Sequence, residues 1–306
     1  MTPPRVSLGC GNFGGVGSSP AFFGKGNTEE EARAIMDAAW AAGIRWFDTA
    51  DAYGGGSSET FIGRWRADRQ PEGLILTTKV YNPVSGDPAD RGLSRDRIRR
   101  NVEGSLARLG IDRIDYYLAH DRDEETPLSE TAGAFEELVG EGTILAWGLS
   151  NHEGPAIQQA LAYGHPALVQ NAYSLLDRED EVEVLPLCGE HDIAYVPFGP
   201  LSGGWLAGKY TRGAEFPAGS RMTMRPEPYE HLVTDSVFDG LDLLAAEAAS
   251  RDVDMATLAF AWVLSHPHVT GAVCGPSRPA HLNPVLAARE LPLAPGERDR
   301  IGSFFQ

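Results

Sequence analysis

Apolar residues recur along the chain at two spacings, which alternate from one segment to the next. The first clear segment has apolar residues three and four positions apart, which is typical of one face of a helix. Thr28 can cap this helix together with Glu31, and Gly43 supplies its end. The run "IRWFDT" follows at once and is mostly apolar, as a buried strand would be. A helix joined to a strand by a short connection is the unit of a parallel α/β fold.

The same unit repeats over almost the whole length. Further helices are predicted near 57–69, 94–109, 128–140, 155–163, 178–190, 235–250, 255–265 and 279–288. The predicted strands are "VSLGCG", "IRWFDT", "LILTTK", "IDYYLAH", "ILAWGLSN", "ALVQNAY", "IAYVPFG" and "TGAVCG". Eight strands, each followed by a helix, predict an α/β protein with the (β/α)8 architecture of a TIM barrel, in a single domain over residues 1–306. A doubly wound sheet, usually of about five to seven strands, is the alternative.

One connection is much longer than the others. Residues from about 199 to 234 are rich in Gly and Pro and follow the seventh predicted strand. Connections of this length inside a compact domain usually have a function. We therefore expect a functional loop here, and not a domain boundary.

Charge excludes several classes of partner. The chain has 26 Lys and Arg against 43 Asp and Glu, a formal net charge of −17. It would repel phosphate backbones and anionic lipids, so nucleic acid and membranes are poor candidates for the main partner. The N-terminus lacks the features of a secretory signal, which predicts a cytoplasmic protein, and the oligomeric state stays open. Cys10, Cys188 and Cys274 are far apart and are expected to be buried, reduced thiols.

A glycine motif near the N-terminus matches the sequence pattern of a dinucleotide-binding fingerprint but lacks the helix that the fingerprint requires. "GCGNFG", from Gly9 to Gly14, fits the pattern G-x-G-x-x-G. The fingerprint requires a helix to begin at its third glycine, so that the helix N-terminus meets the pyrophosphate. Further glycines and Pro20 follow instead, and no helix is expected before Thr28. The motif therefore predicts a glycine-rich loop over the mouth of the barrel.

Polar residues stand at the ends of successive predicted strands, where TIM barrels carry their chemistry. They are Asp48 on the second strand, Lys79 on the third, His120 on the fourth, Ser150 and Asn151 on the fifth, and Gln170 on the sixth. Each has a purely structural alternative: Asp48 could cap a turn, Lys79 could reach solvent, and His120 could be an ordinary rim residue. Their joint position favours a functional site.

Four side chains of this region can form an acid–base site. A tyrosine has a pKa of about 10 and is a poor proton donor at neutral pH. A nearby ammonium would lower the pKa of Tyr53, and a carboxylate paired with that ammonium would fix it, so Asp48, Lys79 and Tyr53 would form a relay. His120 could donate a hydrogen bond to a substrate carbonyl and orient it. The set includes no strong nucleophile with its base, no metal cluster and no source of electrons.

The same stretches resemble the aldo-keto reductases, closest to the bacterial and potassium-channel β-subunit-like branch. The matching segments occur in the family's order: "FDTADAYGGGSSE", "LTTKV", "YYLAH", "GLSN", "VQNAYSLLDR", "PFGPLSGGWLAGKY" and "CGPSRPAHL". The resemblance implies a TIM barrel that binds NADP(H) without a Rossmann domain. It also implies a catalytic tetrad of Asp48, Tyr53, Lys79 and His120, in which Tyr53 is the general acid in carbonyl reduction and the general base in the reverse direction.

The resemblance further implies where the cofactor lies. Ser150, Asn151 and Gln170 would hold the nicotinamide carboxamide, and Tyr173 would stack on the ring. Ser277 and Arg278 match positions that hold the adenosine 2′-phosphate, which suits an arginine near a helix N-terminus. The remaining cofactor positions are Pro200, Leu201 and Gly203 over the pyrophosphate, with Gly275 and His281 in the last motif.

One position departs from the family. A Glu-Asn pair that often contacts the adenine is replaced here by Pro284 and Val285, with Asn283 beside them as a possible substitute. The adenine contacts are therefore expected to differ from those of the family, and the tetrad is unaffected.

The sequence is compatible with three functions. The first is an NADPH-dependent oxidoreductase that reduces an aldehyde or ketone. The second is a cofactor-binding regulatory subunit or sensor, although an intact tetrad disfavours a purely non-catalytic role. The third is a Schiff-base aldolase with Lys79 as the nucleophile, which is disfavoured because Asp48 would keep Lys79 protonated.

The expected substrate-binding loops mix aromatic and charged residues. These residues are Phe22, Phe23, Tyr81, Asp121, Arg122 and Trp205. The mixture suggests a polar, hydroxylated or sugar-like carbonyl compound, and the alternative is that Asp121 and Arg122 point to solvent.

Overall fold

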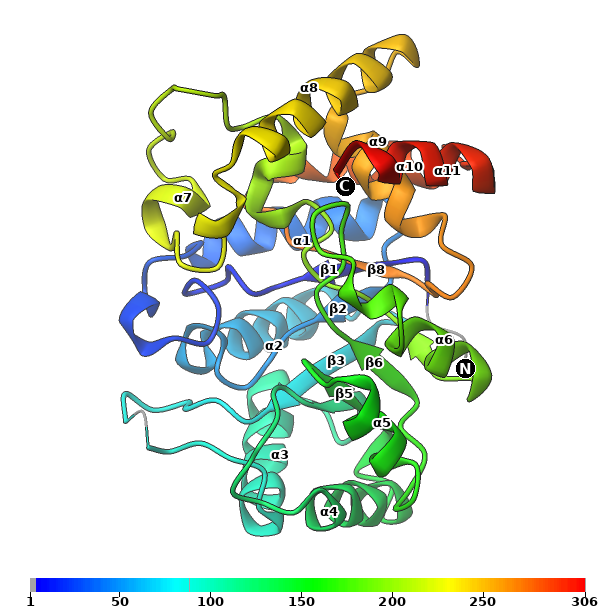
Figure 1. Cartoon of the computed structure of the whole chain (residues 1–306). Coiled ribbons are helices and arrows are strands. Elements are labelled where there is room, and N and C mark those ends of the chain that lie inside the picture. The colour runs from blue at the N-terminus through cyan, green and yellow to red at the C-terminus, as the bar shows by residue number, and fades with distance from the viewer. Residues whose placement is uncertain (1–3, 88, 306) are drawn as a thin grey trace.

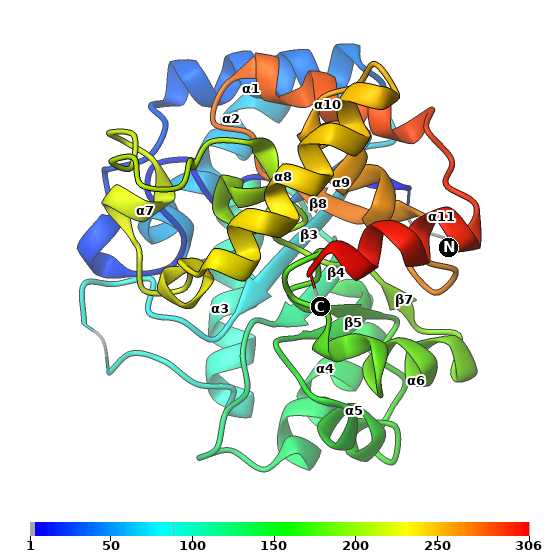
Figure 2. The same cartoon turned by 45° about the horizontal axis from the view of Figure 1, so that its top comes forward.

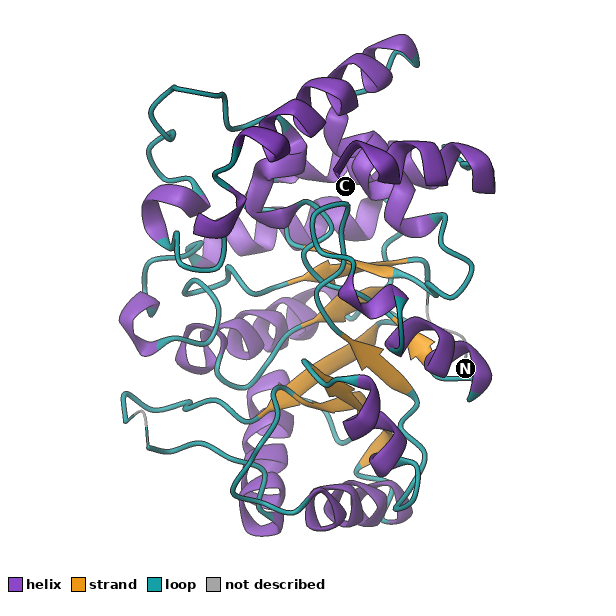
Figure 3. Ribbon diagram, in the orientation of Figure 1, coloured by secondary structure: helices purple, strands orange, loops and turns teal. Residues whose placement is uncertain are grey.

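A computed structural model describes residues 4–87 and 89–305 and contains eight parallel strands surrounded by helices (Figures 1 and 3). The strands are β1 (Val6–Gly9), β2 (Trp46–Asp48), β3 (Ile75–Val80), β4 (Ile114–Ala119), β5 (Ile144–Ser150), β6 (Leu168–Gln170), β7 (Ala194–Tyr195) and β8 (Ala272–Cys274). Their order is β7-β6-β5-β4-β3-β2-β1-β8. The N–H of Thr270 donates to the carbonyl of Tyr195 at 2.9 Å, and the N–H of Val273 donates to that of Pro197 at 2.8 Å. These bonds join the two edge strands, so the predicted TIM barrel is confirmed.

Helices cover the outside of the barrel. The α-helices are α1 (Glu29–Ala41), α2 (Ser57–Arg69), α3 (Arg95–Leu109), α4 (Leu128–Gly140), α5 (Gly154–Ala160), α6 (Val184–Glu190), α7 (Arg221–Met224), α8 (Asp235–Ser250), α9 (Met255–Leu264), α10 (Asn283–Arg289) and α11 (Pro295–Gly302). Short 3-10 turns include η1 (Pro20–Phe22), η2 (Tyr53–Gly56), η4 (Ser202–Ala207), η5 (Glu230–Leu232) and η6 (Pro279–Leu282). The sequence pattern missed α11, which has few apolar residues, and α7, which lies inside the long loop.

Local signals place the helix ends where the pattern predicts them. The Thr28 side chain accepts from the N–H of Glu31, and the Glu31 side chain accepts from the N–H of Thr28, so α1 begins with a capping box. Helix α3 ends at Gly110, which has a left-handed φ of 64°. Between Gly14 and α1 the described chain forms no helical segment except the short turn η1, so the glycine motif has no helix at its third glycine.

The inside of the barrel is filled by side chains. One interior cluster contains Trp46, Tyr116, Leu118, Leu168, Val196 and Val273. A larger apolar cluster lies between the strands and the helices. A filled barrel leaves the ends of the strands as the place for a site.

The long connection after β7 reaches across the mouth of the barrel. Figures 1 and 2 both place α7 beside the loop that follows β1. Arg221 of α7 donates to the side chain of Asn12 in that loop at 2.7 Å. Segments about 200 residues apart in the chain are thus tied together over one end of the barrel.

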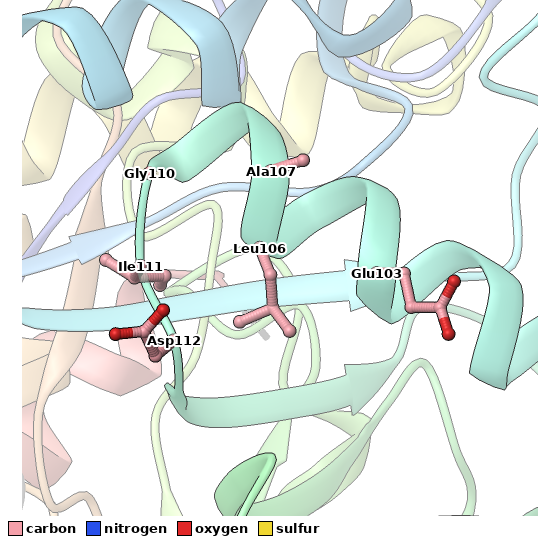
Figure 4. A pocket seen from close by; sticks show the side chains of 6 residues that line it. All are labelled: Glu103, Leu106, Ala107, Gly110, Ile111 and Asp112. Atoms are coloured by element: carbon pink, nitrogen blue, oxygen red, sulfur yellow. The ribbon is translucent and has the colours of Figure 1, made fainter.

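A surface pocket lies at the opposite end of the barrel (Figure 4). It is lined by Glu103, Leu106, Ala107, Gly110, Ile111 and Asp112. Because β4 begins at Ile114, this pocket adjoins the start of a strand and lies away from the strand ends that carry the candidate site. Among the described helices, none is long and apolar enough to cross a membrane.

Candidate active site

The centre of the site is a buried ion pair between β2 and β3. Lys79 Nζ lies 2.6 Å from Asp48 Oδ1, and the two residues are 1% and 2% exposed. Lys79 also donates to the carbonyl of Thr49 at 2.9 Å, and Gln170 donates to Asp48 Oδ2 at 2.8 Å. Burial disfavours the ammonium, but the charge and hydrogen bond of Asp48 and the contribution of Tyr53 together outweigh it, and the pKa of Lys79 is raised. Lys79 is therefore a fixed cation, which argues against a role as a nucleophilic amine.

Tyr53 lies against this pair in the turn η2. Lys79 Nζ is 5.2 Å from the centre of the Tyr53 ring, and the Tyr53 hydroxyl is 3.5 Å from Nε2 of His120. Burial raises the pKa of Tyr53, and the Lys79 ammonium opposes this effect without reversing it. The expected lowering of this pKa is therefore wrong for the structure. The phenol keeps its proton at neutral pH, and the ammonium is in place to stabilise a phenolate once the proton has left.

Glycines shape the turn that carries Tyr53. Gly54, Gly55 and Gly56 have φ values of 60°, 64° and 90°, in the left-handed region that glycine adopts without strain. A Cβ atom on Gly54 would lie 2.7 Å from the carbonyl oxygen of Phe13. Glycine therefore allows the turn to pack directly on the loop after β1.

His120 follows β4 and completes the group of four. Its ring meets that of Tyr53 edge to face, with the ring centres 5.3 Å apart. Burial and the charge of Lys79 hold the pKa of His120 well below its usual value, so the imidazole is neutral. Its Nδ1 is buried and lacks a hydrogen-bond partner among the described residues. The structure thus brings the four predicted tetrad residues together, with His120 Nε2 turned toward the phenol.

The residues predicted to hold the nicotinamide carboxamide lie beside the tetrad. Ser150 and Gln170 pair in the register of β5 and β6. Asn151 has a φ of 59°, a left-handed conformation in which asparagine is enriched, and it donates to the carbonyl of His120 at 2.8 Å. These three side chains therefore continue the polar rim from β4 to β6.

Tyr173 lies elsewhere, and the prediction that it stacks on the nicotinamide is wrong. Its side chain is fully buried, and its ring stacks on Trp262 with the ring centres 5.4 Å apart. Its hydroxyl donates to Glu181 at 2.6 Å and accepts from Arg298. The physical reason is that the chain leaves the rim after β6, and Tyr173 enters the packing beneath α9.

Phe198 is the aromatic side chain at this rim, and sequence reasoning missed it. It is half-buried, and it packs on the interior cluster that contains Val196 and Val273. Its N–H donates to the carbonyl of Asn171 at 3.0 Å, which extends the pairing beyond β7. Alternation could have found it, because Val196 and Phe198 are two residues apart in an extended segment and share a face.

Basic side chains gather where the segments after β7 and β8 meet. Partial desolvation, together with the charges of Arg221 and Arg278, lowers the pKa of Lys209. Arg221 and Arg278 donate to the neutral groups Asn12 and His281, at 2.7 Å and 2.9 Å. In a chain of net charge −17, cations that bond to neutral partners are suited to binding an anion.

The last motif forms a connected group around these cations. His281 Nδ1 lies 3.3 Å from Ser277 Oγ, and the side chain of Asn27 donates to the carbonyl of Ser277 at 3.0 Å. Gly275 directly follows β8 and leads into this group. Ser277, Arg278 and His281 therefore form one hydrogen-bonded group after β8.

The loop after β7 begins at the same rim of the barrel. Pro200 and Leu201 follow the rim residue Phe198, and η4 begins directly after them. Gly203 has a φ of 64°, and a Cβ atom there would lie 2.6 Å from the ring of Tyr229. Glycine is thus required where this backbone meets the segment that contains η5.

Two residues at positions where ligand contacts were expected, Trp205 and Val285, are buried in the core. Trp205 is fully buried and packs against Tyr210, so it does not line a substrate pocket. Val285 is 1% exposed, because it faces the core from α10, while Asn283 is exposed at the start of that helix. Asn283 is therefore better placed than Val285 to contact a ligand.

The remaining pocket candidates differ in exposure. Arg122 is exposed, and its guanidinium lies 3.9 Å from Glu124, so it points to solvent. The half-buried residues are Phe22, Phe23, Tyr81 and Asp121. Of the two charged residues that follow His120, Asp121 is thus the one whose side chain is partly enclosed, and Arg122 points away from the site.

Comparison with known proteins identifies the family of the chain. Residues 5–304 match the profile of the Aldo/keto reductase family. The chain belongs to this family. It is 38% identical to an uncharacterized oxidoreductase of Bacillus subtilis over 89% of this chain and 86% of that protein. It is 32% identical to an NADH-specific methylglyoxal reductase of Escherichia coli (96% and 92% covered), and 32% identical to a probable voltage-gated potassium channel subunit beta of Oryza sativa (84% and 81%).

Solved structures of aldo-keto reductases have the same fold. A glycerol dehydrogenase from Gluconobacter oxydans superposes with a TM-score of 0.84 at 26% identity, covering 98% of this chain and 90% of that one. The holo form of an aldo-keto reductase from Bacillus halodurans superposes with a TM-score of 0.79 at 30% identity, covering 99% and 92%. By fold as well as by sequence, the protein therefore belongs to a family of oxidoreductases.

Proposed function

We propose that the protein is an NADPH-dependent reductase of an aldehyde or ketone, with Tyr53 as the general acid. The observation that carries the proposal is the 3.5 Å approach of the Tyr53 hydroxyl to His120 Nε2, beside the buried pair of Lys79 and Asp48. A carbonyl oxygen placed at these two groups would meet a donor on each side.

The four residues have separate tasks in this proposal. Tyr53 gives its proton to the carbonyl oxygen, and the Lys79 ammonium stabilises the phenolate that remains. Asp48 keeps Lys79 charged and in place. Neutral His120 donates from Nε2 and orients the carbonyl. When bound, the nicotinamide supplies the hydride.

The residues present fit a nicotinamide dinucleotide that carries a 2′-phosphate. Lys209 and Arg221 would hold phosphate oxygens beside the loop of Pro200, Leu201 and Gly203. The 2′-phosphate would lie at Ser277, Arg278 and His281, next to Gly275. Ser150, Asn151 and Gln170 would bind the carboxamide, and Phe198 would pack on the ring.

The substrate in this proposal is a small, polar carbonyl compound in the cytoplasm. The similarity to a methylglyoxal reductase supports a small substrate. The half-buried Asp121, which directly follows His120, could accept a hydrogen bond from a substrate hydroxyl. A regulatory nicotinamide-binding subunit is the second candidate, supported by the similarity to a channel β subunit.

Fluorescence titration with NADPH and NADH, followed by a panel of aldehydes and ketones monitored by NADPH absorbance, tests the proposal. We expect tighter binding of NADPH and turnover of at least one small carbonyl compound. Failure to bind either cofactor would refute the proposal. Tight binding without turnover of any carbonyl would favour the regulatory candidate.

A further inference from the structure

A second buried carboxyl group lies in the same turn as the site, and the tetrad does not use it. Asp51 stands between β2 and Tyr53 and is 0% exposed. Its N–H donates to the carbonyl of Lys79 at 3.1 Å, and its Oδ2 accepts from the side chain of Asn101 at 2.8 Å. Because Asn101 belongs to α3, Asp51 connects the turn that carries Tyr53 to both the Lys79 strand and the helix behind it.

The cations around Asp51 are already paired with other carboxylates. Arg108 of α3 donates to Glu59 of α2 at 2.7 Å, and Glu59 is itself 0% exposed. Arg97 of α3 pairs with Asp90 in the loop after β3. An ionised Asp51 would therefore add a negative charge that these two pairs do not balance, in a place closed to water.

One carboxyl oxygen of Asp51 is without a hydrogen-bond donor, and this bears on the protonation state of the group. Asp51 Oδ1, the hydroxyl of Tyr117 and Nε of Arg97 are all buried and lack hydrogen-bond partners among the described residues. Burial and the charge of Glu59 raise the pKa of Asp51 to about 7. No donor of the described residues reaches Asp51 Oδ1, and a charged carboxylate oxygen without a donor is costly in a place closed to water, so the neutral acid is the form that this environment favours.

We propose that Asp51 is a positioning residue for the reaction: as a neutral carboxylic acid anchored by Asn101, it holds the turn that carries Tyr53 against the Lys79 strand. The inference rests on the proposed reductase function. Ionisation of Asp51 leaves an unbalanced charge in the cluster, loosens the turn and moves the Tyr53 hydroxyl away from His120.

This arrangement gives the reaction a pH dependence that the tetrad does not supply. The pKa of Lys79 and that of Tyr53 are raised, and the pKa of His120 is well below its usual value, so none of the three titrates near neutrality. Asp51 does titrate there, and kcat falls as pH rises through about 7.

The first experiment measures kcat between about pH 5.5 and 8.5 for the wild type, Asp51→Asn and Asp51→Ala. Asparagine keeps a neutral acceptor for Asn101, so Asp51→Asn should retain kcat within about threefold. Its kcat should no longer show the step of the wild type, which is the fall in kcat as pH rises through about 7. Asp51→Ala lacks the anchor and should lower kcat about tenfold or more at every pH, with unchanged NADPH affinity. A step that persists in Asp51→Asn, or wild-type kinetics in Asp51→Ala, would overturn the proposal.

Asp177 provides a matched control. Burial and the charges of Glu179 and Asp180 raise its pKa to about 6, but it lies in the loop after β6, outside the Tyr53 turn. Asp177→Asn should keep the step of the wild type. Loss of the step in this variant would remove Asp51 as its source.

A measurement without turnover separates this proposal from the reductase assignment. The ¹⁹F signal of 3-fluorotyrosine at position 53 should shift as pH rises through about 7 in the wild-type background and stay constant in Asp51→Asn. Equal shifts in both backgrounds would refute positioning by Asp51 even if carbonyl reduction is found. A shift confined to the wild type, together with no carbonyl turnover, would refute only the reductase function.

Discussion

Lys79 is expected to affect both folding and chemistry, because its charge offsets a carboxylate that is almost fully buried. Lys79→Met should abolish turnover and lower the free energy of unfolding by about 3 kcal/mol or more, since Asp48 is left as an unpaired buried charge. Adding Asp48→Asn should restore most of the stability and none of the activity. Urea unfolding and kcat of both variants check this, and a double variant as unstable as Lys79→Met would contradict the role of the pair.

Tyr53 is expected to affect chemistry alone. Tyr53→Phe removes the proton donor and keeps the ring that packs on His120, so kcat should fall about 100-fold or more, with the Kd for NADPH changed less than about twofold. Tyr163→Phe, at a surface tyrosine that is 44% exposed, is the control and should behave as the wild type. Near-normal turnover in Tyr53→Phe would remove the general-acid assignment.

At the scale of elements, the residues at the ends of the strands could be predicted from the sequence. The side of the barrel wall on which a residue lies after a short strand could not. Asp48 ends β2, Lys79 is the second-last residue of β3 and His120 directly follows β4, so their positions follow from the strand count alone. Tyr173 was misplaced because β6 spans only Leu168–Gln170, and three residues later the chain has turned outward. A helix such as α11, whose side chains are mostly polar, carries little periodic signal.

The segment after β8 contains Arg278, which is expected to distinguish NADPH from NADH. Arg278→Ala should weaken NADPH binding about 10- to 100-fold, the value of a charge-assisted phosphate contact, and NADH binding about twofold or less. Arg289→Ala, at the exposed end of α10, is the matched control and should leave both affinities unchanged. Equal losses for the two cofactors would remove Arg278 from the proposed 2′-phosphate site.

For the whole molecule, the repeat of strand and helix was sufficient to predict the barrel, because eight parallel strands close through general rules of twist and connection. Its ionisable interior was not predictable, because a pKa depends on burial and on partners far away in the chain. Asp51 is an example. Its position in the sequence lies inside a recognised motif, whereas the charged and polar side chains around it come from α2, α3 and β4.

Two sets of buried groups act on stability in opposite directions as the protein is acidified. The pKa values of His120, His152 and His266 are lowered by burial, so these residues favour the unfolded state as pH falls from about 7 to 5. The pKa values of Asp51 and Asp177 are raised to about 7 and about 6. Their contribution is fully present below the pKa of an unfolded aspartate and is lost as pH rises through those values.

The stability of the wild type should therefore change little between about pH 7 and 5, because the two sets offset each other. The double variant Asp51→Asn/Asp177→Asn lacks the offsetting carboxyls and should lose about 3 kcal/mol more than the wild type over that range, mostly through the fully buried Asp51. Urea unfolding of both proteins across this range measures the difference. Parallel stability curves would show that the two carboxyls are already ionised in the folded protein, and that the cluster behind Tyr53 balances the charge of Asp51.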